Sequence, residues 1–269
     1  MNRIPRVTIL IANYNYAKYL EKAIESALKQ DYVEIKLAIV DDCSTDNSWE
    51  IIYKKFFKTN PHHVLTTDNA AYQKKEVTIN RFAGIKCTII GYKLKNQNGP
   101  SMARNFAILD NVKSTDYFAI LDADDEYYPY KVRELVNVAI QSPAIGVVYG
   151  DYDILDVETG TLTREYKKPF SVAELLKECI VHSGSLVSSQ ALINTIEGNN
   201  FYDPQLRCAE DYDLWLRICE KFMICHVPKS LSLVRNHNNN STNTVRKEIW
   251  EQCWNIVAQK FQKRHAIDN

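Results

Sequence analysis

The sequence alternates short apolar runs with longer segments whose apolar residues recur at helical spacing. Runs rich in β-branched and aliphatic residues, too short for helices, predict buried strands at 7–12, 37–40 and 117–121. Apolar residues repeated every three or four positions predict helices between them, at 19–28, 47–57 and 101–109. This order of strands and helices predicts an α/β fold with a mostly parallel central sheet and right-handed crossovers.

The remaining segments are less regular. Residues 59–97 contain two short strand patterns, 77–79 and 87–90, which we interpret as a hairpin insertion that precedes or includes the third strand of the sheet. After residue 125 the pattern predicts a helix starting near Pro129, a strand at 147–149, a hairpin turn at 156–160 and a helix at 172–178. An apolar stretch at 182–187 follows. The pattern then predicts an amphipathic helix from about 210, a polar loop at 235–241 and a final helix at 245–264.

Composition limits the classes of protein that fit. The 269 residues are 45% hydrophobic, enough for one large domain with a C-terminal extension. Lys plus Arg and Asp plus Glu both number 33, so the net charge is zero and no electrostatic footprint for nucleic acid is present. The seven cysteines are scattered without CxxC pairs, which argues against a disulfide framework or a zinc site and favours a reducing, cytoplasmic location.

Neither a signal peptide nor a membrane span is expected. The N-terminus runs directly into a strand pattern, and no window approaches the roughly 20 apolar residues that a transmembrane helix needs. The final helix carries Trp250, Trp254, Val257 and Phe261 at helical intervals and several basic residues near its end. This helix either docks on the rest of the protein or lies on a membrane surface or a partner, so the protein is soluble or peripheral to a membrane.

The run 118–121 ends abruptly in acidic residues. Asp122, Asp124 and Asp125 place three carboxylates within four positions, which a packed core accepts only with a cation or strong hydrogen bonds. Ligands bind at the carboxyl ends of parallel strands, so this position agrees with the chemistry. Acidic residues also end the second strand, at Asp41 and Asp42. We expect a ligand site at this edge of the sheet.

Five short segments, in this order, resemble the motifs of family 2 glycosyltransferases with the GT-A fold. They are Val7–Asn15, Val40–Asp46, Gly99–Asn105, Leu121–Asp125 and Glu210–Trp215. The resemblance implies a Rossmann-like sheet flanked by helices, with a small antiparallel subregion on the acceptor side and the C-terminal helix beyond it. It also implies a glycosyltransferase domain at 1–242, with a nucleotide-sugar half (1–125), an acceptor half (126–242) and a helical extension at 243–269.

The resemblance implies transfer of a sugar from a nucleotide diphosphate donor to a hydroxyl group, with inversion and with Mn²⁺ or Mg²⁺. A hard cation held by carboxylates stabilises the charge on the leaving diphosphate. Asp124 is then the direct metal ligand, and Asp122 contacts the ribose or the metal shell. Arg235 and His237 resemble a late motif that closes over the diphosphate and completes the metal shell. Asp125 has no assigned role.

The same resemblance implies which residues bind the donor and which act on the acceptor. Asp42 matches an aspartate that binds the base, and Tyr14 matches an aromatic residue that packs on the base. Ala12 stands where some relatives carry a hydroxyl group. Arg104 is expected to reach the nucleotide. These matches favour a UDP-sugar donor. Glu210 and Asp211 resemble the catalytic acidic pair, with Asp211 as the general base that deprotonates the acceptor. The acceptor is a glycan, a lipid-linked molecule or another hydroxyl compound.

Other interpretations remain at this stage. Each acidic residue could instead cap a helix or a strand end, and Arg104 and His237 could be solvated. A sugar-phosphate nucleotidyltransferase shares a similar nucleotide-binding sheet, but it usually carries a Gly-rich loop after the first strand, and residues 12–19 contain no glycine. A glycoside hydrolase would not explain the nucleotide-site motifs. A sugar-nucleotide or glycan-binding protein without turnover is the non-enzymatic alternative.

Overall fold

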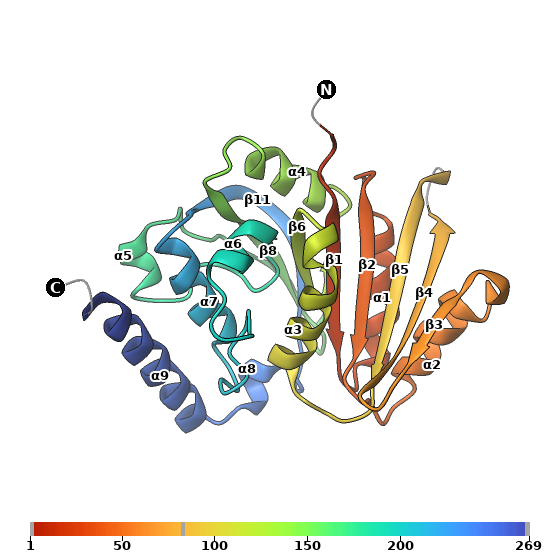
Figure 1. Cartoon of the computed structure of the whole chain (residues 1–269). Helices are drawn as coiled ribbons and strands as arrows, with labels where there is room; N and C mark the ends of the chain where they lie inside the picture. The colour runs from red at the N-terminus through yellow and green to blue at the C-terminus, as the bar shows by residue number, and fades with distance from the viewer. Residues whose placement is uncertain (1–2, 82–83, 267–269) are drawn as a thin grey trace.

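A computed structural model describes residues 3–81 and 84–266. One mixed sheet runs through it in the order β3-β4-β5-β2-β1-β6-β10-β8-β11-β7, with β9 paired to β8. Its strands are β1 (Val7–Asn13), β2 (Ile35–Asp41), β3 (Leu65–Asp68), β4 (Tyr72–Asn80), β5 (Lys86–Leu94), β6 (Tyr117–Asp122), β7 (Glu126–Tyr127), β8 (Ile145–Asp156), β9 (Leu162–Glu165), β10 (Leu186–Ser188) and β11 (Met223–Asn236). Figure 1 shows the sheet extending across the whole molecule.

The helices are α1 (Ala17–Leu28), α2 (Ser48–Ile52), α3 (Pro100–Asn111), α4 (Lys131–Ala139), α5 (Val172–Leu175), α6 (Ser189–Asn194), α7 (Glu210–Cys219), α8 (Ser241–Thr244) and α9 (Lys247–Ala266). A π-helical turn, Tyr53–Phe57, continues α2, and 3₁₀ turns lie at Pro61–His63 and Val112–Ser114. The predicted helices at 47–57 and 245–264 are thus found with shifted ends, and that at 172–178 is one turn long.

The centre of the sheet is parallel, as predicted. β1 pairs in parallel with β2 and with β6, and β2 pairs in parallel with β5. The apolar side chains of β1 and β2 are buried on both faces, which explains why their sequences read as nearly continuous apolar runs. The flanks are antiparallel, and the sheet as a whole is mixed.

Residues 59–97 form the antiparallel strands at one flank. The patterns at 77–79 and 87–90 are parts of the longer strands β4 and β5, and β5 also supplies the parallel neighbour of β2. The insertion therefore includes a central strand, one of the two arrangements expected. β3 was not predicted, because all four of its residues are exposed and carry no apolar alternation.

The second half of the chain returns to complete the sheet. β11 pairs in parallel with β8 and in antiparallel with β7, which directly follows the acidic end of β6. The prediction of a polar loop starting at Arg235 is wrong in one respect, since Arg235 and Asn236 are the last residues of β11. Pro228 and Lys229 lie in an irregularity of the pairing, which hides this strand in the sequence.

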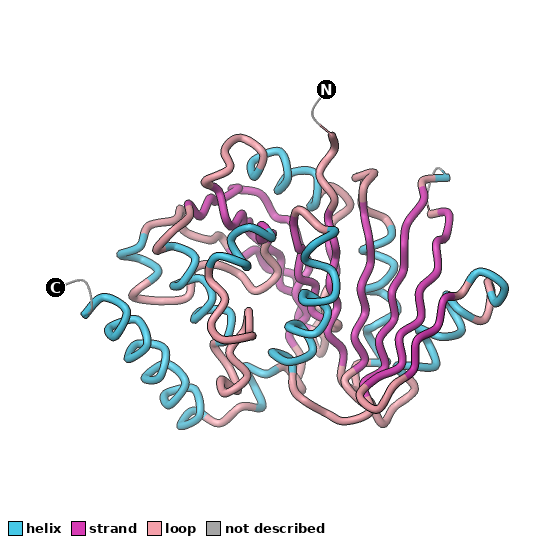
Figure 2. The backbone as a smooth tube through the Cα atoms, in the orientation of Figure 1, coloured by secondary structure: helices cyan, strands magenta, loops and turns pink. Residues whose placement is uncertain are grey.

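Helices cover both faces of the sheet and form two apolar cores. One core joins the sheet to α1 and α4, and the other joins it to α3, α6 and α7 (Figures 1 and 2). Within the described ranges, no helix is both long and apolar enough to cross a bilayer.

The C-terminal helix α9 docks on the rest of the protein. Its Trp254 ring lies 4.4 Å from that of Tyr212, and Val257 is fully buried. The Lys260 ammonium lies 2.9 Å from carboxylate oxygens of both Asp203 and Asp213. Of the two interpretations of this helix, docking is therefore the one observed.

Candidate active site

The carboxyl ends of β1 and β2 meet in a hydrogen-bonded cluster. Asn13, buried at the end of β1, donates from Nδ2 to Asp41 Oδ1 (2.9 Å) and to Ser44 Oγ (3.1 Å). The next turns are unusual, because Asn15 and Cys43 both have left-handed backbone with φ of 58° and 61°. Strained residues of this kind gather at ligand-binding turns.

The residues predicted to bind the base lie at this edge. Ala12 pairs with Val40 on one side and Asp122 on the other, and Tyr14 is 36% exposed just beyond. Asp42 is buried, and its carboxylate accepts backbone N–H groups of Asn98 and Gly99 at 2.7–3.1 Å. Burial raises the pKa of Asp42, and these hydrogen bonds oppose the rise.

At the end of β6, Asp122 is held by two partners. Arg104 on α3 donates from Nη2 to Asp122 Oδ1 (2.9 Å), and Ser183 donates from Oγ to Oδ2 (3.0 Å). Burial opposes ionisation of Asp122, but the Arg104 charge and the hydrogen bonds from Ser183 and Arg104 together help to outweigh it, and the pKa is lowered. Ser183 was missed by the sequence reasoning, because no spacing or charge sets it apart.

Asp124 lies beside the loop that follows β11. Its Oδ2 is 3.1 Å from His237 Nε2 and accepts from Asn240 Nδ2 at 3.1 Å. His237 is buried, and its ring stacks on Tyr19 of α1 at 4.8 Å. Burial and then the charge of Asp122 raise the pKa of Asp124, so a positive charge is favoured here.

Asp125, which had no assigned role, connects two strand ends. Its Oδ1 accepts the backbone N–H of Arg235 at 2.9 Å. The Arg235 guanidinium in turn donates to the main-chain oxygen of Asp124 at 2.5 Å and to the Glu126 carboxylate. Asp125 thus fixes the start of the His237 loop against the acidic strand end.

The acidic pair opens α7. The Glu210 carboxylate accepts from Arg104 Nη1 at 2.6 Å, so one buried guanidinium joins Glu210 to Asp122. Burial first, and then the Glu210 charge, raise the pKa of Asp211 from 3.8 to about 7, while Arg104 opposes the rise. Ala209, which precedes the pair, has left-handed backbone with φ of 59°. The site therefore contains a carboxylate that changes charge near neutral pH.

The residues at Asp124 fit a divalent cation that a donor completes. Within residues 3–81 and 84–266 no three His, Cys, Asp or Glu side chains form a metal-binding group. The 3.1 Å between Asp124 Oδ2 and His237 Nε2, however, matches the roughly 3 Å between adjacent ligands of an octahedral Mg²⁺ with 2.1 Å bonds. Mg²⁺ sites commonly use one or two carboxylates and substrate phosphates, and Asp124 is such a carboxylate. Both oxygens of Asp122 are already hydrogen-bonded.

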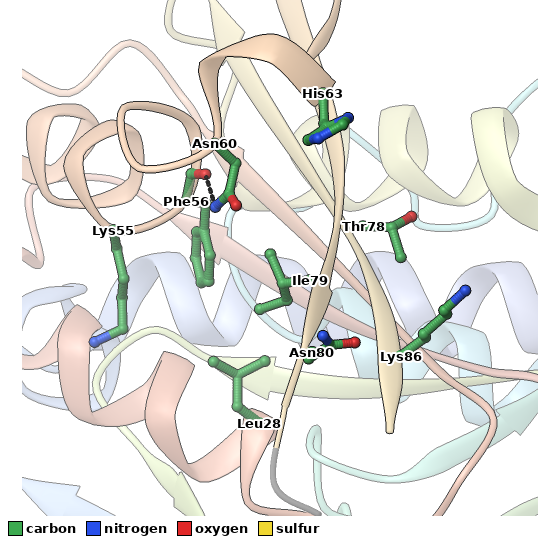
Figure 3. Close-up of a pocket in the computed structure, with 9 residues that line it drawn as sticks. All are labelled: Leu28, Lys55, Phe56, Asn60, His63, Thr78, Ile79, Asn80 and Lys86. Atoms are coloured by element: carbon green, nitrogen blue, oxygen red, sulfur yellow. Dashed lines mark hydrogen bonds between the residues drawn. The ribbon is translucent and has the colours of Figure 1, made fainter. Parts of the chain in front are cut away.

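The structure thus brings most of the predicted residues together in two connected groups. Asp122, Arg104, Glu210 and Asp211 form one, and Asp124, Arg235 and His237 form the other. A separate hollow of about 720 Å³ lies between the end of α1, the π-helical turn and β4 (Figure 3). None of the residues that line it was predicted to be functional.

Comparison with known proteins identifies the family. Residues 8–74 and 63–183 match the family described as Glycosyl transferase family 2, and the two matches together cover more than half of the chain. The chain belongs to glycosyl transferase family 2. The match stops before Glu210, so the acidic pair and His237 lie outside it.

Curated relatives agree with this family. An uncharacterised glycosyltransferase of Rickettsia typhi is 27% identical over 98% of this chain and 74% of its own length. Another from Rickettsia felis is 30% identical over 96% of this chain, and the hyaluronan synthase of Pasteurella multocida is 25% identical over 99%. This chain spans only 38% and 24% of these two proteins.

Solved structures share the fold. The TarS fragment 1–349 of S. aureus in complex with UDP-GlcNAc gives a TM-score of 0.66 at 15% identity, covering 91% of this chain and 64% of that one. A mannosyltransferase of Pyrobaculum calidifontis in complex with GDP-Man and Mn²⁺ gives 0.53 at 16% identity, covering 86% and 56%. The expected GT-A fold is confirmed.

Proposed function

We propose that this family 2 member transfers a sugar from a nucleotide diphosphate sugar to an acceptor hydroxyl, with inversion and with Asp211 as general base. The observation that carries the proposal is the Arg104 bridge between Glu210 and Asp122. It joins the acidic pair to the strand end where a donor phosphate and cation would bind. A nucleotidyltransferase would need no such second acidic pair.

Asp211 has the properties of a base for this reaction. A carboxylate with a pKa of about 7 is a stronger base than an ordinary one, and it is ionised above neutral pH. Its Oδ1 accepts the backbone N–H of Tyr212 at 2.8 Å, and within the described residues no hydrogen bond engages Oδ2. The Glu210 carboxylate is ion-paired with Arg104, which leaves Asp211 as the member able to take the proton.

Asp124 and His237 would hold a Mn²⁺ or Mg²⁺ ion, which when bound neutralises charge on the leaving diphosphate. Hydrogen bonds of Asp125 and Arg235 hold the backbone that carries these two side chains in place. The Asp42 carboxylate already accepts the N–H groups of Asn98 and Gly99, but each oxygen has two lone pairs, so one can also accept from the N3–H of uracil; a UDP-sugar is therefore the first donor to test. The UDP-GlcNAc and GDP-Man bound to the two structural neighbours support a nucleotide sugar in general.

The test is release of nucleoside diphosphate from a panel of UDP- and GDP-sugars, with Mn²⁺, with Mg²⁺ and with a chelator. We expect release from at least one donor, loss of release with chelator, and an inverted anomer in the product by NMR. Asp124→Asn should raise the Mn²⁺ concentration needed for half-maximal release. Release from no donor, with or without added saccharides, would refute transferase activity. A retained anomer would refute inversion.

A further inference from the structure

The segment between β9 and α5 is fixed against β8 by its backbone. The N–H of Lys167 donates to Asp151 Oδ1 at 3.0 Å, and the Tyr149 hydroxyl donates to the main-chain oxygen of Lys168 at 2.6 Å. Arg164 also pairs with Asp151, at 3.1 Å. The backbone position of Lys167 is therefore set by the sheet.

The half-buried Lys167 side chain lies beside an aromatic pair. Its ammonium is 5.8 Å from the ring centroid of Tyr152, whose ring is 4.4 Å from that of His182. Burial raises the pKa of the Cys179 thiol, the charge of Asp211 raises it further, and the charge of Lys167 opposes the rise. Ser183, which follows His182, donates to Asp122 at 3.0 Å, so the ring pair of Tyr152 and His182 connects Lys167 to the acidic site.

Lys167 differs from its basic neighbours in lacking a counter-ion. Lys168 pairs with Glu174 and Glu178 at 2.8 and 2.5 Å, and Arg164 pairs with Asp151. In the part of the chain that the structure describes, no carboxylate oxygen lies within 4.0 Å of the Lys167 ammonium. A half-buried cation that has an aromatic neighbour but no counter-ion favours an anionic ligand.

We propose that Lys167 binds an anionic substituent, a carboxylate or a phosphate, on the acceptor substrate. This inference rests on the proposed function, because it takes the side of the site that contains Asp211 as the acceptor side. The rings of Tyr152 and His182 provide an apolar surface for the sugar that carries this substituent. A neutral acceptor leaves the ammonium without a partner.

Three acceptor probes that differ in one group test the proposal: methyl β-glucoside, the corresponding methyl glucuronide and the glucoside 6-phosphate. Each is titrated by NMR into the full chain with UDP and Mn²⁺. We expect one charged probe to bind at least roughly tenfold more tightly than the neutral one. Whether the glucuronide or the 6-phosphate binds more tightly shows whether Lys167 favours a carboxylate or a phosphate.

Lys167→Gln should abolish this preference, and Lys167→Arg should keep most of it. Lys168→Gln is the matched control, since it removes an adjacent lysine that is already ion-paired. Equal binding of the three probes, binding of none, or a preference that survives Lys167→Gln would overturn the proposal. Failure of the proposed function is seen separately, as absence of diphosphate release from every donor without acceptor.

Discussion

Replacing Asp211 by asparagine should abolish transfer and at the same time make the folded protein more stable at neutral pH. The carboxyl group is desolvated and lies beside Glu210, which raises its pKa from 3.8 to about 7. The amide has almost the same shape and no charge. The variant therefore removes the unfavourable ionisation while it leaves the packing of α7 unchanged.

The size of the gain follows from the two pKa values. Below about pH 4 the carboxyl is protonated in both the folded and the unfolded chain, so it does not affect stability. Between pH 4 and 7 the unfolded chain loses this proton and the folded chain keeps it, so the free energy of unfolding falls. The full difference is roughly 4 kcal/mol, reached near pH 7 and constant above it.

The assay is urea denaturation of the wild type and of Asp211→Asn at pH 5, 6, 7 and 8. The advantage of the variant should grow with pH and level off above about pH 7. Asp203→Asn is a control of opposite sign. Burial raises the pKa of Asp203, but the hydrogen bonds from Lys260 and the Gln205 backbone, together with nearby positive charge, outweigh burial and lower the pKa. This carboxylate stabilises the fold above pH 4, so its variant should be less stable at pH 8.

Parallel stability curves for the wild type and Asp211→Asn between pH 5 and 8 would refute the reasoning, because Asp211 would then ionise normally. Binding of the donor to Asp211→Asn, measured by calorimetry, should remain close to that of the wild type. Substantial transfer by this variant would remove Asp211 from the role of base.

Three further predictions concern the surroundings of the same residue. Glu210→Gln removes a charge that raises the pKa of Asp211, so transfer should rise with pH at a lower pH than in the wild type; an upward shift would contradict this. Ala209→Gly should stabilise the fold by about 1 kcal/mol in urea denaturation, because left-handed backbone strains alanine; a loss of stability would count against the strain. Lys260→Met should cost about 1 to 3 kcal/mol, since it removes one of the two cations, Lys260 and Arg217, that pair with the fully buried Asp213 of α7; an unchanged urea midpoint would show that α9 docks without this ion pair.

The central strands could be predicted because their physics is local. β1, β2 and β6 are buried on both faces, so the sequence must be apolar at nearly every position. β11 could not be recognised in this way, because its pairing is interrupted around Pro228 and many of its residues are only half-buried. Its place in the sheet is decided by contacts with β8 and β7 that are distant in sequence.

In the predicted site, too, local features could be read from the sequence, and contacts between distant residues could not. The acidic end of β6 was visible as an electrostatic anomaly, and the role of Asp125 was not, because its partner is a backbone N–H on another strand. Arg104 was expected at the nucleotide, and the structure gives its guanidinium two carboxylates, Asp122 and Glu210. Whether it also reaches a nucleotide stays a prediction. Its role as a bridge depends on three elements that only the fold brings together.

The hydrogen bond between Asp125 and Arg235 has a consequence for synthesis of the protein in the cell. The two residues are 110 positions apart. At about 5 to 20 residues per second, a ribosome needs roughly 5 to 20 seconds to cover that distance. During this interval the acidic end of β6 has been synthesised, but neither the end of the strand that fixes it nor His237 has. Any chain released early therefore carries the acidic motif without a finished site.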